Sequence, residues 1–524
     1  MWKADNGDGT YTNPILYADY SDPDAIRVGE DYYLTASTFT NVPGLPVLHS
    51  KDLVNWEVIS YALQELPGER FKEVQHGCGV WAPSIRYHDG KFWICFPMPD
   101  EGIFMTTASD PKGPWSEPFC VKSAKGWIDP CPLWDDDGKA YLVHAFARSR
   151  AGINCVLAIS EMKPDGTGLI GEDKIVIDGH DTQPTLEGPK IYKRGDYYYI
   201  LAPAGSVPAG WQTAFRSKNI WGPYEEKIVM IQGNSSINGP HQGALVDTPS
   251  GEDWFIHFRD IESPGRICYL EPVKWLRDWP RIGTAGGDDI GFGEPVETYK
   301  KPNTGAQQPI TEPAANDEFD GSKGSSVPAE NEGEIGRLSL AWQWNCNTKP
   351  GWYQIRKDHL ELNSQKAERQ LCDMPSLLLQ KWPVPSFVNE TSLDATALFD
   401  GEIGGMIVMS KEYKAIGVRK SGEGEAATYH FVEIVGNIKG DNEVIRELEE
   451  VEDPKHAIIR VKVMKGETAQ LSYGSHSHMT LMSEYGTVPG HWVGVKNGLF
   501  AIAPNKEGKG KLVVDYFRFE SFMY

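Results

Sequence analysis

The sequence has no apolar run that approaches the length of a membrane span and no useful stretch of helix-period hydrophobicity. Its start, MWKADNGDGT, lacks a basic region followed by an apolar segment. As it stands, the sequence therefore predicts no export signal, a cytoplasmic protein and no membrane partner. A periplasmic or secreted protein is the alternative, if a signal peptide has been removed.

Positive charge is also in short supply. The 51 Lys and Arg residues are outnumbered by 73 Asp and Glu residues, which gives a formal net charge of −22 spread along the chain. Phosphate backbones are repelled by such a surface, so nucleic acid is not an expected partner and a neutral substrate fits better. The eight cysteines show no CxxC pairing, which favours buried free thiols over disulfides or a metal site.

Turn and strand formers dominate instead. Aromatic residues make up 11% of the chain, which also contains 54 Gly and 36 Pro. This composition indicates an all-β protein, and 524 residues are too many for one ordinary domain.

A five-residue phrase recurs five times, and its anchors are spaced by 48 to 59 residues. In each copy an apolar residue lies four positions after the anchor, and a Gly/Asp turn and a second strand-like run follow. The phrases are Asp22-Pro-Asp-Ala-Ile26, Trp81-Ala-Pro-Ser-Ile85, Asp129-Pro-Cys-Pro-Leu133, Glu187-Gly-Pro-Lys-Ile191 and His241-Gln-Gly-Ala-Leu245. A unit of this length predicts a blade, so residues 1–300 are expected to form a five-bladed β-propeller.

The remaining chain changes character twice. A stretch rich in Pro, Gly, Gln and charge precedes residue 317, and we place a linker at 301–316. From 317 to 524, alternating or aromatic runs such as HAIIRVKVM and LVVDYFRFE predict a β-sandwich that packs on the propeller.

Three of the five anchors are carboxylic acids, and the first strand of every propeller blade lines the central channel. Asp22, Asp129 and Glu187 should therefore converge on one axis, which costs free energy unless a proton is shared. Taken alone, Asp22 fits a turn residue before proline better than a catalytic residue, whereas Glu187 fits a capping or salt-bridging carboxylate equally well. Their common register favours chemistry, with Asp24 as the structural neighbour.

One acid and one base suit hydrolysis of a glycosidic bond. Glu187, beside Leu and Gly-Pro, is the expected acid, Asp22 the base, and an ionised Asp129 would hold the proton of Glu187. Residues on blades one and four face each other across the channel. That separation favours inversion of the anomeric centre over retention.

Other residues are candidates for binding. Trp81 and, less directly, Phe39 offer aromatic faces for a sugar, or simply pack in the core. Arg266 is placed to reach a substrate hydroxyl, to pair with a carboxylate, or to form a surface ion pair. His241 reads as a substrate ligand, a core residue or a metal ligand; with no Cys/His partner nearby, zinc catalysis is not expected.

These motifs resemble glycoside hydrolase family 43 over essentially the whole chain. The resemblance rests on NPILYADYSDPDAIRVGEDYYLTASTF, GVWAPSIRYHDGKFWI, WIDP, LEGPKIYKRGDYYYI, GPHQGALVDTPSG, GRICYLEPVKW and DEFDG. It implies a five-bladed propeller followed by a jelly-roll, concanavalin A-like β-sandwich of the kind found in β-xylosidases. It also implies inversion with Asp22 as base, Asp129 as pKa modulator and Glu187 as acid.

The resemblance further implies Ca²⁺ on the propeller axis, bound by His241 and waters, and a second calcium in the sandwich, for which Asp317 and Asp515 are the expected ligands. The chain departs from many β-xylosidases of this architecture at Thr40-Asn41-Val42-Pro43-Gly44 and at YSDPD. Both changes are expected near the sugar pocket, where they bear on xylose versus arabinofuranose.

The leading hypothesis is an exo-acting inverting glycosidase that releases terminal β-D-xylose or α-L-arabinofuranose from xylo-oligosaccharides or arabinoxylan-type fragments. A loop at 485–491 is the expected lid. The alternatives are an α-L-arabinofuranosidase only, a non-catalytic sugar-binding propeller, and a fructoside hydrolase, although the Asn-Asp-Pro-Asn run of that group is missing. The sequence leaves the linkage and the oligomeric state open.

Overall fold

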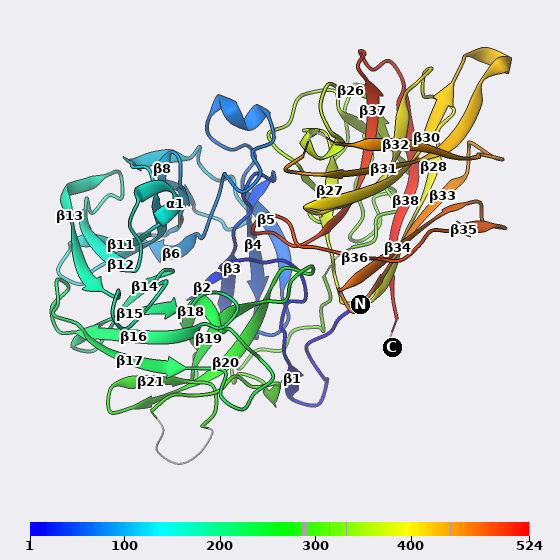
Figure 1. Ribbon diagram of the computed structural model, residues 1–524. Coiled ribbons are helices and arrows are strands. Elements are labelled where there is room, and N and C mark those ends of the chain that lie inside the picture. Colours follow the sequence, from blue (N-terminus) through cyan, green and yellow to red (C-terminus); the bar gives the residue numbers. More distant parts are fainter. Residues whose placement is uncertain (286–290, 314, 332, 441, 523–524) are drawn as a thin grey trace.

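The computed structural model describes residues 1–285, 291–313, 315–331, 333–440 and 442–522. Two β-rich parts lie side by side (Figure 1). The first contains five four-stranded antiparallel sheets, each with its strands in chain order. The expected five-bladed propeller is thereby confirmed.

The blades follow the sequence repeat. Blade 1 contains β2 (Asp24–Val28), β3 (Asp31–Thr35), β4 (Gly44–Ser50) and β5 (Glu57–Leu63). Blade 2 contains β6 (Ser84–His88), β7 (Lys91–Met98), β8 (Gly102–Ala108) and β9 (Phe119–Ser123). Blade 3 contains β10 (Trp127–Trp134), β11 (Ala140–Phe146), β12 (Val156–Met162) and β13 (Leu169–Asp178), blade 4 contains β14 (Lys190–Arg194), β15 (Tyr197–Ala204), β16 (Trp211–Ser217) and β17 (Glu225–Met230), and blade 5 contains β18 (His241–Asp247), β19 (Asp253–Asp260), β20 (Arg266–Leu276) and β21 (Trp279–Ile282). The phrase anchors Asp22, Trp81 and Glu187 lie just before the first strand of their blades. Asp129 and His241 lie within it, so the repeat identifies the inner strand of every blade.

The two ends of the propeller are tied together. Strand β1 (Thr10–Thr12) pairs with β22 (Thr298–Lys300), which follows blade 5. The described residues of 301–316 contain no helix or strand. This segment lies along blade 1, where the Thr311 N–H donates to Asn55 (3.0 Å) and the Gln308 amide oxygen accepts from the Lys51 N–H (2.6 Å).

The second part is a sandwich of two eight-stranded sheets, as expected. In the first sheet the strand order is β23 (Gln343–Trp344), β27 (Leu378–Lys381), β37 (Lys496–Pro504), β29 (Ile403–Met409), β30 (Glu412–Ser421), β31 (Thr428–Asn437), β32 (Val444–Glu450), and β26 (Gln365–Ala367) also pairs with β37. In the second sheet the order is β24 (Tyr353–Arg356), β25 (His359–Asn363), β38 (Lys511–Ser521), β28 (Phe387–Asp394), β33 (Ala457–Met464), β34 (Thr468–Gly474), β35 (Met479–Leu481), and β36 (Tyr485–Gly486) also pairs with β34. Alternating apolar residues of both sheets face inward, which explains the period-two sequence pattern.

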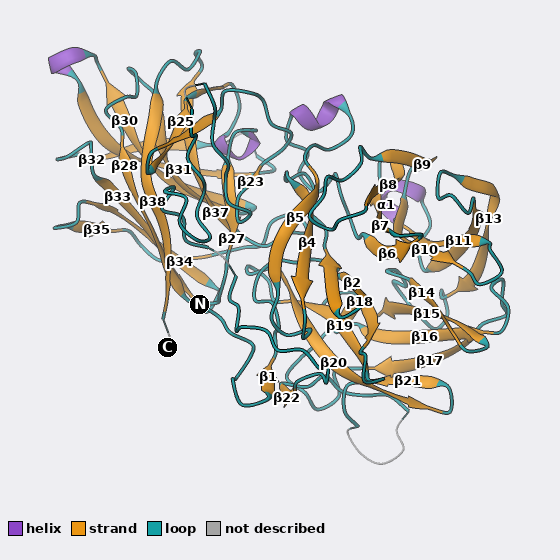
Figure 2. Cartoon of the chain, turned by 180° about the vertical axis from the view of Figure 1, so that it is seen from behind, coloured by secondary structure: helices purple, strands orange, loops and turns teal. Residues whose placement is uncertain are grey.

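Among the described residues, helical turns occur only in connections, as the view from behind shows (Figure 2). They are η1 (Glu69–Lys72), α1 (Arg148–Ala151), η2 (Leu371–Asp373) and η3 (Gly424–Ala426). In the part of the chain that is described, no helix is long and apolar enough to span a membrane. All eight cysteines are described and none forms a disulfide, as expected; six are buried, whereas Cys78 is half-buried and Cys120 is exposed.

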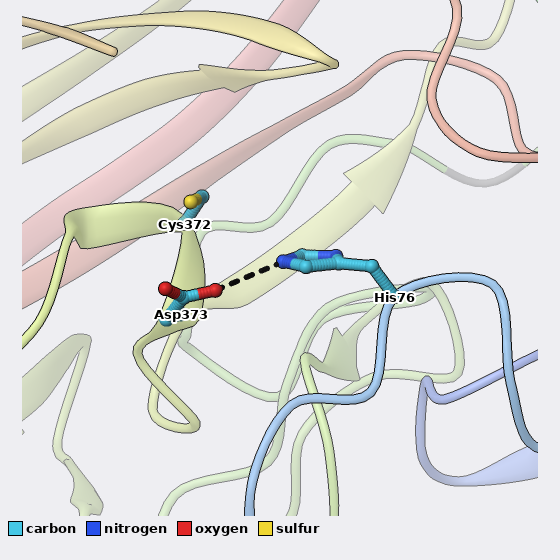
Figure 3. A group of neighbouring side chains, drawn as sticks. All are labelled: His76, Cys372 and Asp373. Atoms are coloured by element: carbon cyan, nitrogen blue, oxygen red, sulfur yellow. Dashed lines mark hydrogen bonds and ion pairs between the residues drawn. The ribbon is translucent and has the colours of Figure 1, made fainter. Parts of the chain in front are cut away.

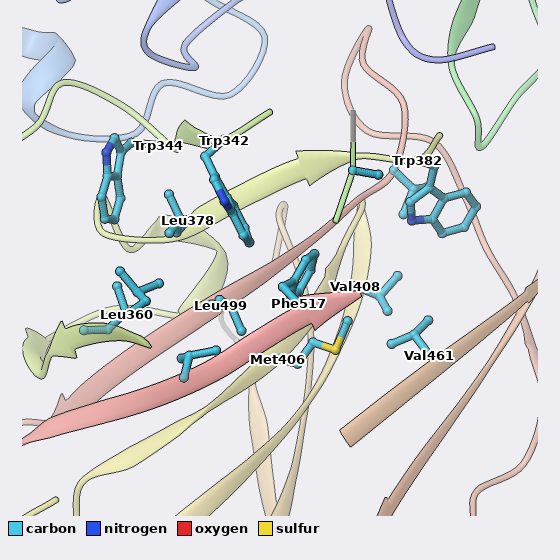
Figure 4. Close-up of a cluster of buried hydrophobic side chains, with 14 of the residues drawn as sticks. Trp342, Trp344, Leu360, Leu378, Trp382, Met406, Val408, Val461, Leu499 and Phe517 are labelled. Carbon is cyan, nitrogen blue, oxygen red and sulfur yellow. The ribbon is translucent and has the colours of Figure 1, made fainter. Parts of the chain in front are cut away.

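The sandwich core is rich in tryptophan. Trp342, Trp344 and Trp382 pack with aliphatic side chains between the two sheets (Figure 4). The same cluster continues into blades 1 and 2 of the propeller. At this boundary the backbones of Val42 and Trp344 exchange two hydrogen bonds of 3.1 and 2.6 Å. A shared core and a shared backbone bridge fix the sandwich against the propeller mouth.

Candidate active site

A pocket of about 350 Å³ opens at the propeller axis. Its lining includes all six residues that the sequence assigns to catalysis or sugar binding, namely Asp22, Phe39, Trp81, Asp129, Glu187 and Arg266. The structure therefore brings these six predicted residues together. The remaining lining comes from the propeller, apart from Trp492 of the sandwich.

Asp22 is held in a fixed orientation. Its backbone occupies the left-handed region (φ 55°), which Asp tolerates better than most residues. One carboxylate oxygen accepts hydrogen bonds from the hydroxyls of Ser21 (2.8 Å) and Ser37 (2.6 Å), and the other accepts from Arg266 (2.9 Å). Three donors, one of them a guanidinium, suit an ionised carboxylate that can accept a proton from water.

Glu187 and Asp129 form a neighbouring pair on blades 4 and 3. The Gly188 N–H donates to Asp129 (2.7 Å), which places the Asp129 carboxylate beside the Glu187 backbone. Gly188 has a φ of 60°, and a side chain there would collide with Gln242. The Asp129 side chain is buried, whereas Glu187 retains 36% exposure, at the pocket.

The surroundings of Glu187 and Asp129 shift the pKa values of the two carboxyl groups to different extents. Burial raises the pKa of Glu187, and repulsion from Asp129 raises it further. Burial and repulsion from Asp22 also raise the pKa of Asp129, but the Gly188 hydrogen bond and the Lys190 ammonium oppose that rise. We therefore place the retained proton on Glu187, whose carboxyl group accepts no hydrogen bond from any described residue. A protonated carboxylic acid facing the pocket is the state that an acid catalyst requires.

His241 lies against Glu187, with 3.6 Å between its Nε2 and a Glu187 oxygen. Burial lowers the pKa of His241 to about 3, so the imidazole is neutral. Neither ring nitrogen has a hydrogen-bond partner among the described residues. An unpaired, buried ring nitrogen fits a water or a cation as its partner, so this residue passes the test for the calcium site expected from the resemblance.

The two predicted aromatic residues lie together. The Phe39 and Trp81 rings are 6.4 Å apart with an interplanar angle of 51°, and the Arg150 guanidinium lies 5.1 Å from the Trp81 ring. Trp81 Nε1 donates to the Gly77 carbonyl (3.1 Å), which anchors the ring at the pocket edge. Phe39 is almost fully buried and forms a backbone bridge with Val80. Trp81 is thus the more accessible platform.

Arg266 is a buried partner of Asp22, and the alternative of a surface ion pair is wrong. Its side chain is 9% exposed, and its guanidinium also stacks over Phe258 at 4.9 Å. The Asp260 carboxylate lies 3.6 Å away. Arg266 therefore orients Asp22 from inside the pocket wall.

Sequence reasoning missed several residues of the site. Trp492 from the sandwich lines the pocket at 49% exposure, 5.6 Å from the Arg266 guanidinium. The expected lid at 485–491 stops one residue short of it. Ser21 and Ser37 carry no motif of their own, and the buried Lys190 ammonium donates to Pro83 and Ser84 rather than to a carboxylate. Their spacing in sequence gave no signal, because the propeller brings distant strands together.

The divergent segment at Thr40–Gly44 lies at the domain boundary. Thr40 donates to the Asn345 carbonyl (2.8 Å) and Asn41 to the Trp344 carbonyl (3.2 Å), while the Pro43 carbonyl accepts from Gln343 (2.8 Å). Neither Thr40 nor Asn41 lines the pocket of the three acids. The segment follows Phe39, which does line that pocket, and its own polar contacts dock the sandwich.

The second predicted calcium site does not fit its residues. Asp317 is fully buried, and its oxygens accept from the N–H groups of Phe319 and Ser326, the Ser326 hydroxyl and the Trp342 indole. These donors point their hydrogens at the carboxylate, where a cation would be repelled. Asp515 is exposed on β38. The pairing of Asp317 with Asp515 around calcium is therefore wrong; Asp317 is a hydrogen-bonded structural residue.

Comparison with known proteins agrees with this geometry. The model of the glycosyl hydrolases family 43 matches residues 11–280, and that of the β-xylosidase C-terminal concanavalin A-like domain matches residues 334–520. A protein of Xylanibacter ruminicola, provisionally named a β-xylosidase, is 39% identical over 427 residues, covering 80% of this chain and 74% of its own. A non-reducing end α-L-arabinofuranosidase of Bacteroides ovatus is 29% identical over 436 residues, covering 77% and 74%.

The solved structure of Bacteroides ovatus xyloglucan PUL GH43B superimposes with a TM-score of 0.81 at 25% identity, over 98% of this chain and all of that one. Both parts of the fold and their arrangement are thus shared with a solved protein. The matched models cover the propeller that carries the three acids and the sandwich that contributes Trp492. The chain belongs to glycosyl hydrolase family 43.

Proposed function

We propose that this chain is an exo-acting, inverting glycosidase that releases terminal β-D-xylosyl or α-L-arabinofuranosyl residues from xylo-oligosaccharides or arabinoxylan-type fragments. The observation that carries the proposal is the pairing of two differently held carboxyl groups in one pocket. Asp22 is bonded by three donors, and Glu187 is protonated beside Asp129. A pentose sugar is supported by the names of the related proteins.

The catalytic cycle follows from the protonation states. Water enters between Asp22 and the anomeric carbon, and Asp22 accepts a proton from it as the C–O bond forms. Glu187 donates its proton to the leaving oxygen as the glycosidic bond breaks, so the sugar leaves with inverted configuration. Asp129 keeps Glu187 protonated, and Arg266 holds Asp22 in line.

Exo action is supported by the Trp492 side chain, which the sandwich places in the lining of the propeller pocket. A pocket bounded in this way suits the end of a chain better than its middle. Trp81 supplies an aromatic face for the sugar, since sugar C–H groups pack on aromatic rings. The negatively charged surface matches a neutral oligosaccharide rather than a polyanion.

We also propose that His241 holds Ca²⁺ through one ring nitrogen, with waters completing its shell. When bound, the ion supplies positive charge next to the crowded carboxylates. Chelator treatment should then lower the Tm of the wild type, and calcium should restore it. The His241→Gln variant should show neither shift; equal shifts in both proteins would contradict the assignment.

One experiment tests the reaction. Aryl β-xyloside and aryl α-arabinofuranoside are hydrolysed in an NMR tube, and the first anomer of the released sugar is read before mutarotation. Inversion predicts α-xylose from the β-xyloside. Initial formation of the β-anomer would refute the inverting mechanism, and binding without turnover of either substrate would support the sugar-binding alternative instead.

Comparing kcat/KM for the two substrates assigns the sugar preference. A ratio of at least about tenfold corresponds to roughly 1.4 kcal/mol of transition-state discrimination. An enzyme with α-L-arabinofuranosidase activity alone would hydrolyse the aryl α-arabinofuranoside and leave the aryl β-xyloside intact.

A further inference from the structure

A second group of metal-binding side chains lies at the boundary between propeller and sandwich. It consists of His76, on the propeller loop between η1 and β6, and Cys372 and Asp373, in the η2 turn of the sandwich (Figure 3). The His76 Nε2 and an Asp373 oxygen are 3.2 Å apart. One ligand atom of each residue lies within 4.8 Å of the other two.

We propose that His76, Cys372 and Asp373 bind a Zn²⁺ ion that joins the two domains, with water at the fourth position. Imidazole, thiolate and carboxylate are the ligand types that zinc takes from proteins, and thiolate excludes calcium or magnesium as the intended ion. Among the described residues, no other group of three such side chains has its ligand atoms this close. The proposal stands apart from the glycosidase function.

The geometry needs little adjustment. Two nitrogen or oxygen ligands at about 2.0–2.1 Å from tetrahedral zinc are roughly 3.3 Å apart, and a sulfur ligand is about 3.5 Å from either. The His76–Asp373 separation of 3.2 Å already has this value. The sulfur lies within 4.8 Å of the other two ligand atoms, so it needs to approach by at most about 1.3 Å, within the reach of one χ1 change or a small shift of the turn.

The surroundings favour a cation. The carboxylates of Asp373 and Glu443 both place negative charge near the Cys372 sulfur. A divalent ion offsets that charge and takes the place of the thiol proton. Glu443 is itself fixed, because it accepts hydrogen bonds from the Leu371 N–H (2.6 Å) and the Tyr413 hydroxyl (2.7 Å).

The turn that presents the two sandwich ligands is also held from behind. Asn345 donates to the carbonyls of Cys372 (2.9 Å) and Met374 (3.1 Å). Outer contacts of this kind orient metal ligands and commonly tune affinity. On binding, the Cys372 proton leaves to solvent, and His76 takes the tautomer with its proton on Nδ1.

Zinc here would act at a distance on the sugar pocket. Gly77, the residue after His76, accepts the Trp81 indole hydrogen bond. A metal that fixes His76 to the sandwich thus fixes the loop on which the Trp81 platform depends. The ion would be a structural zinc that links the two domains and takes no part in the chemical step.

The test uses the full-length protein, stripped of metal under reducing conditions and then loaded with Zn²⁺ or Co²⁺. We expect a single zinc ion per chain after gel filtration, and a thiolate-to-cobalt charge-transfer absorption. Cys372→Ser should abolish that absorption. His76→Gln, in a partly exposed loop, should weaken zinc binding by more than the roughly 10- to 100-fold typical of losing an outer contact, with the fold intact by circular dichroism.

Cys346→Ser is the matched control, because it removes another buried thiol of the sandwich and should leave zinc and cobalt binding unchanged. His241→Gln should also leave them unchanged, which separates this site from the calcium site. Failure to retain zinc, or equal retention by wild type, Cys372→Ser and His76→Gln, would overturn the proposal. Neither outcome depends on glycosidase activity.

Discussion

Two buried aspartates, one in each domain, accept a similar number of hydrogen bonds but have different roles, one in the pocket and one in the structure of the sandwich. Asp22 accepts from two serines and an arginine, and its carboxylate lines a pocket. Asp317 accepts from two N–H groups, a hydroxyl and an indole, and it is enclosed. Hydrogen bonding alone therefore does not mark a catalytic carboxylate. Access to a pocket and a protonated neighbour do.

The surroundings of the two residues show the same contrast. The pocket holds three acids together and leaves both nitrogens of His241 without a hydrogen-bond partner among the described residues. Asp317 is fully buried, and the rings of Phe319 and Trp342, two residues that donate to it, stack at 6.3 Å. Function here is associated with a crowded, incompletely paired site, and stability with a fully paired one.

The largest expected effect comes from removing the proton donor. Glu187→Gln keeps the side-chain size but cannot protonate a leaving oxygen, so kcat should fall about 10²- to 10⁴-fold on substrates with poor leaving groups. Aryl glycosides with good leaving groups should lose much less. Steady-state kinetics on both substrate classes provides the measurement, and an equal loss on both would argue against the acid role.

The same variant should be more stable than the wild type at high pH. The folded-state pKa of Glu187 is raised, so the folded protein holds this proton more tightly than the unfolded chain. Glu187 therefore contributes its full stabilisation to the wild type below the pKa that it has in the unfolded chain. That contribution is lost as pH rises through the pKa that it has in the folded protein. Gln does not titrate, so the Tm gain of the variant should grow between about pH 5 and pH 8.

Asp317→Asn should change stability and leave catalysis alone. The amide cannot accept from all four donors, and one buried donor is left unpaired, at a cost of about 1–3 kcal/mol in the free energy of unfolding. Denaturant melts provide this value, and kcat/KM should be unchanged. Asp515→Asn, on the exposed face of β38, is the matched control and should lie within about 0.5 kcal/mol of wild type. A Tm rise of the wild type by calcium that Asp317→Asn abolishes would restore the rejected calcium site.

Trp492→Ala tests whether the sandwich takes part in binding. The indole lines the pocket beside Arg266, and its loss should raise KM about tenfold with a smaller change in kcat. Phe399→Ala removes another exposed aromatic residue of the sandwich, 44% exposed and outside the pocket lining, and should have no kinetic effect. Unchanged KM in Trp492→Ala would confine substrate recognition to the propeller.

The propeller was predictable because its signal is repeated. Five phrases with the same internal spacing identify five inner strands, and the blade geometry then brings Asp22, Asp129 and Glu187 together. Trp492 was not predictable in the same way, because its place depends on how the sandwich docks. That docking relies on contacts such as Val42 with Trp344, which have no repeat and no local pattern.

Asp317 shows the opposite failure. Its sequence context was interpreted through a family resemblance as a calcium ligand, and the structure surrounds it with hydrogen-bond donors instead. A carboxylate next to a turn reads the same whether it binds a cation or caps backbone N–H groups, since both need a negative oxygen. Only the identity of the facing atoms separates the two.

The smallest expected effect is on the pH dependence of activity, and it tests how Asp129 influences the proton of Glu187. Repulsion from Asp129 is one cause of the raised pKa of Glu187, so Asp129→Asn should lower that pKa. Activity depends on protonated Glu187 and is lost as pH rises through its pKa, so the alkaline limb of the kcat/KM profile should move to lower pH, by about one unit. The profile is measured at fixed calcium, so that His241 keeps one environment throughout. A limb that stays in place would mean that burial and the more distant Asp22 set the Glu187 proton, and that Asp129 acts by orienting Glu187 through the Gly188 hydrogen bond.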